Sequence, residues 1–378
     1  MYNGRDCLAT AELRYWIGFN LVKGIGPAKV RRLLDYFGDV ASAWAAGPDD
    51  LRAAGLDHRS LDALLAARVG IDLDLALKRI EQAGVQVITW DDAQYPRNLL
   101  TIPQPPPVLY VKGTLAPGDE WAVAMVGTRR ASAYGREVAR ELGMGLAASG
   151  VTVVSGLARG IDAVAHQAAL DGGGRTIAVL GSGLDHIYPS EHRALAEAIA
   201  ASGALVSDYP LGTRPEGGNF PPRNRIISGL SKGVVIVEAP EGSGALITAE
   251  FAAEQGRDVF AVPGSILLRS CRGTNKLIQD GARPILGVND LLEELNLTLI
   301  SEHQEARTLL PADATEQQLL ACLSAEPMHV DELRARIDLP IAQVSGALAL
   351  MELKGLVRQV GGMNYVAARE ARAGYRVE

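Results

Sequence analysis

The turn GTRRASAYG, which begins at the end of the apolar run WAVAMVG, combines glycine with two arginines. Gly127 and Thr128 precede Arg129 and Arg130, and the residues that follow have the composition of a helix. Free backbone N–H groups at a helix N-terminus favour an anion, and two arginines beside them suit a phosphate. The turn lacks GxGxxG, so we do not expect nicotinamide chemistry. The alternative for Arg129 is an ordinary solvated loop side chain.

Two later turns also place glycine and basic residues after an apolar run. SGLARGID contains Ser155, Gly156 and Arg159, and GSGLDHIYPSEHR contains Arg193. If these runs are parallel strands, their turns meet at one edge of the sheet. The sequence therefore predicts one rim that gathers several basic groups.

The most basic segment is PLGTRPEGGNFPPRNRIISGLSKG, residues 210–233, whose only acid is Glu216. An aromatic residue, Phe220, lies among its cations. This composition is typical of a surface that follows a nucleic-acid backbone and stacks a base. The alternative is that Phe220 is a core residue under a long loop. The cations of the segment are Arg214, Arg223, Arg225 and Lys232.

Metal and nucleophile motifs are absent from the sequence. The six histidines show no HExxH or HxH spacing, and the three cysteines include no CxxC pair. There is no GxSxG, and Ser155 has no evident base nearby. We expect His166 to lie on a helix surface or to be a satisfied hydrogen-bond partner. The sequence thus predicts no metal and no cofactor.

Two further motifs leave alternatives open. In APEGSGALITAEFAAEQG, Gly242 and Gly244 precede a helix that bears Glu250, which resembles a nucleotide-hydrolysing loop with one glycine missing and Thr248 displaced. The other reading is a tight turn with a surface glutamate. KGIGPAKVRRLL, residues 23–34, resembles a helix-hairpin-helix motif that meets a DNA phosphate, or it is a structural turn.

Six apolar runs bounded by glycine predict the strands that position these turns. Continuous apolar runs are typical of strands buried on both faces of a parallel sheet, and here they alternate with Ala- and Leu-rich helical stretches. We therefore expect a doubly wound, extended Rossmann-like α/β domain over residues 121–298. The runs are residues 121–127, 151–156, 176–183, 204–210, 233–240 and 258–264.

Other segments flank this domain. Residues 1–69 read as short helices separated by Gly and Pro. Residues 70–120 contain PRNLLTIPQPPP, which we interpret as an extended connector packed on the core domain. After a linker at 299–312, residues 313–370 show three helical stretches and two short strands around a GG turn. This is the winged-helix pattern, with IAQVSGALALMELKG in the recognition-helix position.

The composition is globular, with 48% hydrophobic and 21% charged residues. The net charge of −7 means that nucleic-acid binding would need a local basic patch. Residues 313–366 hold seven acids against four Lys and Arg, which weakens a DNA-binding role for the winged helix. Without paired cysteines, a leader-like start or a run of 18 apolar residues, we expect a cytoplasmic protein with no membrane association.

Several of these motifs together resemble the DNA-processing protein A (DprA, or Smf) family. They are VGTRRASAYG, VSGLARGIDAVAHQAAL, GSGLDHIYP, FPPRNRIISGLSKGVVIVEA, SGALITAEFAAEQGRDVFAVPG and GTNKLIQDGA. The resemblance implies a helical SAM-like domain, a Rossmann domain and a winged helix. It also implies a single-stranded DNA binder that is not an enzyme, that protects incoming strands and that loads RecA recombinase during natural transformation.

The resemblance also implies roles for individual residues. Arg129 would grip a phosphate, Phe220 would stack on a base, and Asn224 with Arg225 would shape that pocket. Family members often have a DNA-binding lysine three residues before the phenylalanine, where this chain has Gly217, so more of the affinity would rest on Arg193, Arg214 and Arg223. The implied DNA-binding set is Gly127, Arg129, Ser155, Gly156, Arg159, Arg193, Arg214, Phe220, Arg223, Asn224 and Arg225.

The family dimerises through the late part of the α/β domain, which corresponds here to GTNKLIQDGA. We therefore expect a homodimer interface that includes Leu277 and Ile278. The competing hypotheses are a nucleotide-binding or nucleoside-monophosphate-hydrolysing enzyme that uses Glu250, and a winged-helix regulator.

Overall fold

A computed structural model describes most of the chain. The described residues are 4–297, 315, 318–319, 322–323, 328–337, 339–353, 357–360 and 362–367. The chain forms two compact units, Met1–Thr298 and Leu299–Glu378. No helix among the described residues is long and apolar enough to span a membrane.

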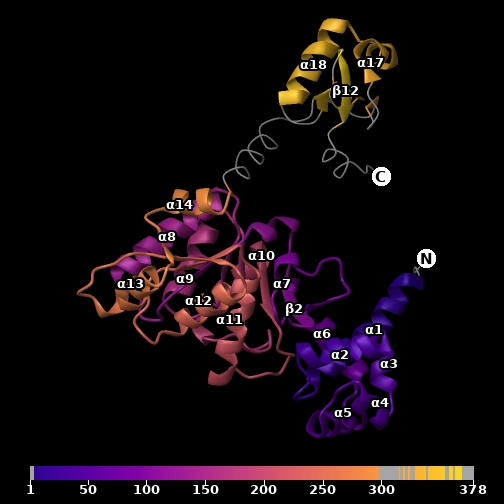
Figure 1. The fold of residues 1–378 in the computed structure, drawn as a ribbon, viewed down its shortest axis with the longest axis vertical. Helices are drawn as coiled ribbons and strands as arrows, with labels where there is room; N and C mark the ends of the chain where they lie inside the picture. Colours follow the sequence, from indigo (N-terminus) through magenta and orange to yellow (C-terminus); the bar gives the residue numbers. More distant parts are fainter. Residues whose placement is uncertain are drawn as a thin grey trace. The chain divides into compact units, whose positions relative to one another are not determined.

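Short helices make up the beginning of the first unit, as the Gly and Pro spacing predicts (Figure 1). Pro27 and Pro48 occupy first-turn positions, where a missing N–H costs nothing, and Asp39 and Asp57 cap two other helices by accepting from backbone amides. These helices are α1 (Gly4–Leu21), α2 (Pro27–Phe37), α3 (Val40–Ala45), α4 (Pro48–Ala53) and α5 (His58–Gly70).

A nine-stranded sheet follows, with the order β1-β2-β6-β5-β4-β3-β7-β8-β9. Every pairing from β6 to β9 is parallel, and all six runs predicted as strands are confirmed. Those six strands are β3 (Val123–Val126), β4 (Val153–Ser155), β5 (Thr176–Val179), β6 (Ala204–Ser207), β7 (Gly233–Ile236) and β8 (Asp258–Ala261), and β9 (Arg283–Pro284) lies at the far edge.

Residues 70–120, expected to form an extended connector, instead add two α-helices and two strands. The segment contains α6 (Leu73–Gln82), β1 (Gln86–Thr89), α7 (Arg97–Leu100) and β2 (Val108–Gly113). β2 pairs antiparallel with both β1 and β6. The consecutive prolines end at Pro107, just before β2, so they leave its hydrogen-bond ladder intact. The segment therefore completes the sheet.

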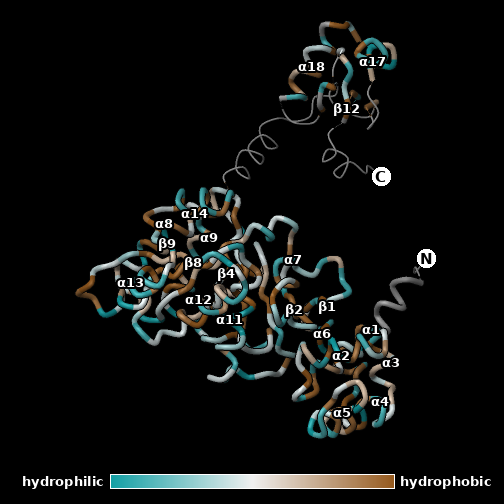
Figure 2. The backbone as a smooth tube through the Cα atoms, viewed as in Figure 1, coloured by the Kyte–Doolittle hydropathy of each residue, from teal (hydrophilic) through white to brown (hydrophobic). Residues whose placement is uncertain are grey.

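Helices cover both faces of the sheet (Figure 1). α8 (Ala133–Ala148), α9 (Ile161–Asp171) and α10 (Arg193–Ser202) pack in succession, whereas α11 (Phe220–Gly229) packs with α12 (Gly244–Glu254). Alternate β5 residues enter different cores, because successive side chains on a strand point to opposite faces. Ala178 joins the core that also contains the N-terminal helices, and Ile177 and Val179 join the core under α11. Both hydrophobic (brown) and hydrophilic (teal) residues occur along the helices that cover the sheet (Figure 2).

The remaining described elements are short. α13 (Arg272–Gln279) and α14 (Val288–Glu294) complete the first unit. In the second unit, α17 (Val330–Ile337) and α18 (Ile341–Leu353) pack with a sheet of order β10-β12-β11. The strands are β10 (Met328–His329), β11 (Val357–Gln359) and β12 (Asn364–Ala367), which agrees with the predicted winged helix. The linker predicted at 299–312 lies outside the described residues.

Candidate nucleic-acid interface

A cleft of about 720 Å³ opens at the carboxyl ends of the central strands. It lies where β3 separates β4 from β7, the point at which the order of the parallel strands reverses. Open α/β sheets bind ligands at this switch point. The lining comes from the segments after β3, β4, β5, β6 and β7 and from the beginnings of α9, α11 and α12. It includes Thr128, Arg129, Arg130, Asp162, Tyr188, Gly217, Phe220, Arg223, Asn224, Ser243 and Thr248.

Phe220 forms one wall of this cleft. The alternative, that it is a core residue under a long loop, is wrong. Its side chain is half-buried, and Phe220 is the first residue of α11. Arg129 Cζ lies 5.6 Å from the ring centroid, and the centroid of Tyr188 lies 5.7 Å away. A Cβ at Gly181 would lie 3.0 Å from Phe220 Cδ1, so the ring packs directly against the backbone of Gly181. Tyr188, which the sequence did not single out, gives the cleft a second aromatic ring.

Several of the backbone N–H groups predicted to be free in and after the GTRR turn are not free, because protein oxygens accept from them. Thr128 N donates to the Glu238 carbonyl at 2.7 Å, and Ser132 N donates to Glu238 Oε2 at 2.9 Å. Arg130 N donates to Thr128 Oγ1 at 3.2 Å. The exposed side chains of Arg129 and Arg130 are therefore the main groups that this turn offers to a phosphate.

A second buried carboxylate, Asp162, fills the neighbouring turn. It is only 6% exposed and accepts from Gly156 N at 3.2 Å and from Ala158 N at 3.3 Å. The Gly127 amide also bonds to it. Burial raises the pKa of Asp162, and Arg223 with the backbone donors acts in the opposite direction. The cleft thus has carboxyl groups of its own, each hydrogen-bonded to backbone N–H groups.

Arg223 is part of the cleft floor and not a free cation. It is 5% exposed, and its Nη1 donates to the Gly156 carbonyl at 2.9 Å and to the Val179 carbonyl. Burial lowers its pKa to about 10, so it stays charged at neutral pH. Its Cζ lies 6.0 Å from the Phe220 ring centroid. Gly156 must be glycine here, since a Cβ would lie 2.7 Å from Arg223 Nη2.

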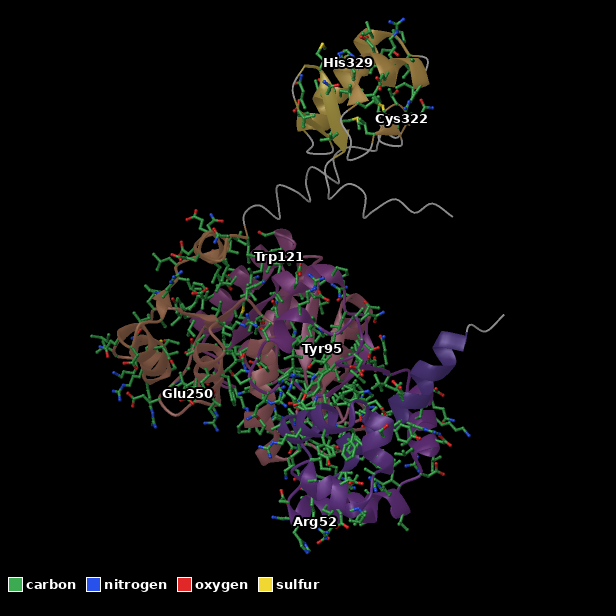
Figure 3. The ribbon with its side chains drawn as sticks, turned by 45° about the vertical axis from the view of Figure 1, so that its right-hand side comes forward. Arg52, Tyr95, Trp121, Glu250, Cys322 and His329 are labelled. Atoms are coloured by element: carbon green, nitrogen blue, oxygen red, sulfur yellow. The ribbon has the colours of Figure 1, made fainter. Side chains whose placement is uncertain are left out.

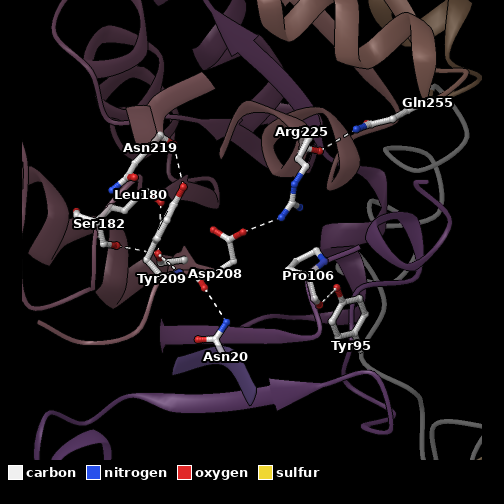
Figure 4. A network of polar contacts seen from close by, with 11 residues as sticks. Asn20, Tyr95, Pro106, Leu180, Ser182, Asp208, Tyr209, Asn219, Arg225 and Gln255 are labelled. Carbon is white, nitrogen blue, oxygen red and sulfur yellow. Dashed lines mark hydrogen bonds and ion pairs between the residues drawn. The ribbon is translucent and has the colours of Figure 1, made fainter. Parts of the chain in front are cut away.

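Two other predicted site residues lie outside the cleft. Arg225 pairs with Asp208 at 2.7 Å and lines a separate cavity (Figure 4). Ser155 is fully buried, and its Oγ donates to the Met125 carbonyl at 2.6 Å. Neither residue is in a position to contact a ligand in the cleft.

The other three predicted DNA-binding arginines differ in whether an acidic side chain pairs with them. Arg159 pairs with Glu191 at 2.5 Å beside Tyr188. Arg193 and Arg214 are exposed and do not line the cleft.

Three smaller residues shape the cleft itself. Asn224 lines it and donates to the Gly244 carbonyl at 3.3 Å. Gly127 packs tightly, because a Cβ there would lie 2.5 Å from Ile161 Cγ1. Gly217 also lines the cleft, and nothing lies within 4 Å of a Cβ built on it. A longer side chain would therefore fit at Gly217.

Glu250 lies away from the cleft, at the periphery of the sheet domain (Figure 3). It lines a groove of about 400 Å³ with Asp258 and Asp280. The same groove includes Leu277, which packs partly on the core, and Ile278 beside it is half-buried.

The GIG hairpin of the N-terminal helices is largely engaged in internal contacts. Lys29 Nζ donates to Asp57 Oδ2 at 2.5 Å and to Ser60 Oγ at 2.6 Å, which ties the hairpin to α5. Arg31 lies 4.7 Å from the centroid of the Trp90 ring. Lys29 and Arg31, two of the four positively charged residues of this segment, therefore make contacts within the folded protein.

His166 is completely buried, so of its two predicted placements the helix surface is wrong and the hydrogen-bond partner is confirmed. Its Nδ1 lies 2.6 Å from Thr176 Oγ1, whose hydroxyl donates to the Val153 carbonyl. Burial lowers the pKa of His166 to about 3. The imidazole is therefore neutral at physiological pH and forms part of the core.

The winged helix shows no basic surface on its recognition-position helix. α18 has Glu352 as its single charged residue. Ile341 and Leu350 on this helix are exposed. Such a surface lacks the cations that usually meet a DNA backbone.

The fold and the cleft together define a Rossmann-like protein with a cationic, aromatic ligand cleft and an attached winged helix. Two family models match the chain: DNA recombination-mediator protein A over residues 86–296, and the DprA winged helix domain over residues 303–363. The chain belongs to the DprA (Smf) family.

Relatives and solved structures agree with this assignment. Protein Smf of Synechocystis is 40% identical, over 95% of this chain and 99% of the relative. DNA processing protein DprA of Bacillus subtilis is 45% identical over 59% of this chain and 75% of its own. The X-ray structure of DprA from Streptococcus pneumoniae superposes with a TM-score of 0.67 at 36% identity, covering 74% of this chain and 97% of that one.

A DNA processing protein A from Helicobacter pylori, described for its single-stranded DNA binding mode, superposes with a TM-score of 0.51. It is 31% identical and covers 56% of this chain and 95% of that one.

Proposed function

We propose that this protein binds single-stranded DNA in the cleft, with a base against Phe220 and the adjoining phosphates at Arg129 and Arg130. The observation that carries the proposal is the placement of an accessible aromatic ring beside an exposed arginine in a cleft of about 720 Å³. Aromatic rings stack on any base, and arginine side chains neutralise phosphates without reading sequence. The single-stranded DNA binding mode described for the Helicobacter pylori relative supports the same assignment.

The internal carboxylates favour a strand over a small nucleotide. Asp162 and Glu238 occupy the backbone donors that would otherwise hold a compact phosphate group. A ligand therefore gains its charge contacts at the rim, where a polymer can extend past the cleft in both directions. Glu250 lines a different groove, so it cannot act on a ligand held at Phe220.

Within the family assignment, we further propose that the protein works without catalysis as a recombination mediator that protects incoming strands and loads RecA recombinase during natural transformation. A homodimer formed through Leu277 and Ile278 is part of this proposal. The test is RecA filament formation on DNA already covered by single-strand binding protein. The protein should accelerate it, and equal rates with and without the protein would contradict the loading role.

The binding experiment is a titration of labelled oligonucleotide followed by fluorescence anisotropy. With roughly three to five neutralised phosphates, the log-log salt dependence of the affinity should have a slope of about −2 to −4. Phe220→Ala should weaken binding by about 1–3 kcal/mol without lowering the thermal midpoint. A slope near zero, or a Phe220→Ala protein that melts early yet binds normally, would contradict the proposal. Nucleoside monophosphates serve as the control ligand and should bind far more weakly.

A further inference from the structure

The residues that follow β6 join the N-terminal helices to the first turn of α11. Asn20, at the end of α1, donates through Nδ2 to the Asp208 carbonyl at 3.2 Å. The Asp208 carboxylate accepts from Arg225 Nη2 at 2.7 Å. The Tyr209 hydroxyl donates to the Asn219 carbonyl at 3.3 Å (Figure 4). One short segment thus contacts the helical module on one side and α11 at two points on the other.

One of the two contacts to α11, that of Tyr209, is made to the residue directly before Phe220, and the other, that of Asp208, is made to Arg225 about one and a half turns further along the helix. Asn219 directly precedes Phe220, and Pro221 and Pro222 follow it without N–H groups of their own. The first turn of α11 therefore has few backbone N–H groups that can donate hydrogen bonds to the surrounding protein. Burial, reinforced by Asp208, raises the pKa of Tyr209 to about 12, so its hydroxyl remains a donor at neutral pH.

The segment is itself held in place. Ser207 Oγ donates to the Ser182 carbonyl at 2.7 Å, and Tyr209 N donates to Ser207 Oγ at 3.0 Å. Asn20 is oriented by Tyr110 of β2, whose hydroxyl donates to Asn20 Oδ1 at 3.0 Å.

The link between Asp208 and Arg225 rests on one contact. Among the described residues, Asp208 Oδ1 and Arg225 Nη1 have no hydrogen-bond partner. Both residues border a cavity of about 130 Å³ that the GIG hairpin closes. The ion pair therefore depends on a single oxygen and a single nitrogen.

We infer that Asp208 and Tyr209 are positioning residues of the cleft, which hold Phe220 in place for a DNA base, and that Asn20 makes this placement depend on the N-terminal helical module. The inference rests on the proposed DNA-binding role of Phe220. It goes beyond that role because none of these three residues lines the cleft.

The test is a double-mutant cycle between Tyr209→Phe and Phe220→Ala. The readouts are the affinity for an oligonucleotide that contains 2-aminopurine and the quenching of its fluorescence on stacking. Loss of one hydrogen bond should weaken binding about two- to tenfold and reduce the quenching. In the Phe220→Ala background, Tyr209→Phe should have no further effect, because the two residues act through the same contact. Tyr36→Phe, on an exposed tyrosine, is the matched control and should leave both readouts unchanged.

The outcomes separate the inference from the function on which it rests. Equal losses from Tyr209→Phe in both backgrounds, or a lower melting temperature with unchanged affinity and quenching, would overturn the positioning role while DNA binding stands. Wild-type binding by Phe220→Ala itself would overturn both.

Asn20→Ala tests the contribution of the helical module. It should weaken binding in the same direction as Tyr209→Phe, whereas Gln82→Ala, on an exposed position of α6, should not. Unchanged binding by Asn20→Ala would remove the module from the inference.

Discussion

Gly217→Lys should strengthen DNA binding. Gly217 lines the cleft three residues before Phe220, and a Cβ built there meets no atom within 4 Å, so the backbone leaves open space where a lysine side chain begins. Each added phosphate contact on single-stranded DNA steepens the log-log salt slope by about 0.7. The affinity advantage of the variant over the wild type should therefore shrink about 2.6-fold between 50 and 200 mM salt.

The assay is fluorescence anisotropy with a labelled oligonucleotide at four salt concentrations. Gly217→Gln adds a side chain of similar length without charge, and Gly118→Lys adds the same charge in open space away from the cleft. Both controls should keep the wild-type slope. If Gly217→Lys binds no better than Gly118→Lys, or if its slope is unchanged, the placement of phosphates at this rim is refuted.

Four further predictions concern other parts of the molecule. Arg129→Ala should weaken binding equally for all oligonucleotide sequences and leave the fold intact, because a phosphate contact carries no base information; anisotropy with several sequences checks this. Glu250→Gln should leave oligonucleotide affinity unchanged, and turnover of a nucleoside monophosphate lost with this substitution would favour an enzyme. Ile278→Glu should convert a dimer to a monomer in light scattering, since a two-fold contact meets the charge twice, whereas Leu277→Glu should unfold the domain because Leu277 packs on the core. His166 binds a proton in the unfolded chain below about pH 6.5 but in the folded protein only near pH 3. Stability should therefore fall with falling pH between these values by up to about 1.4 kcal/mol per unit from this group, and urea unfolding of His166→Gln should show a weaker pH dependence.

The parallel strands were predictable because each is a continuous apolar run that ends at a glycine or a turn. β1 and β2 were not, because their signal is short and their neighbours are prolines. β2 pairs with β6, about ninety residues later in the chain, and no local pattern indicates such a partner. The pairing of Tyr110 with Ser207 and of Val111 with Val206 is a tertiary contact, which forms only when the chain folds.

The candidate site was likewise predictable only in part. Arg129 and Phe220 were found from composition and both line the cleft, whereas Arg225 does not. A helix turns about 100° per residue, so Arg225 points about 140° away from Phe220 once α11 begins at that residue. The buried roles of Asp162 and Glu238 could not be predicted, because Asp and Glu are usually surface residues.

The most direct test of the cleft is photocrosslinking with a single-stranded oligonucleotide that carries one 5-iodouracil, followed by peptide mapping of the adduct. The proposed function predicts that the crosslinked residue is Phe220 or Tyr188, whose rings lie together in the cleft. Phe220→Ala should move the adduct to Tyr188 or abolish it. Adducts confined to α18 or to the GIG hairpin, with none in the cleft, would contradict the account.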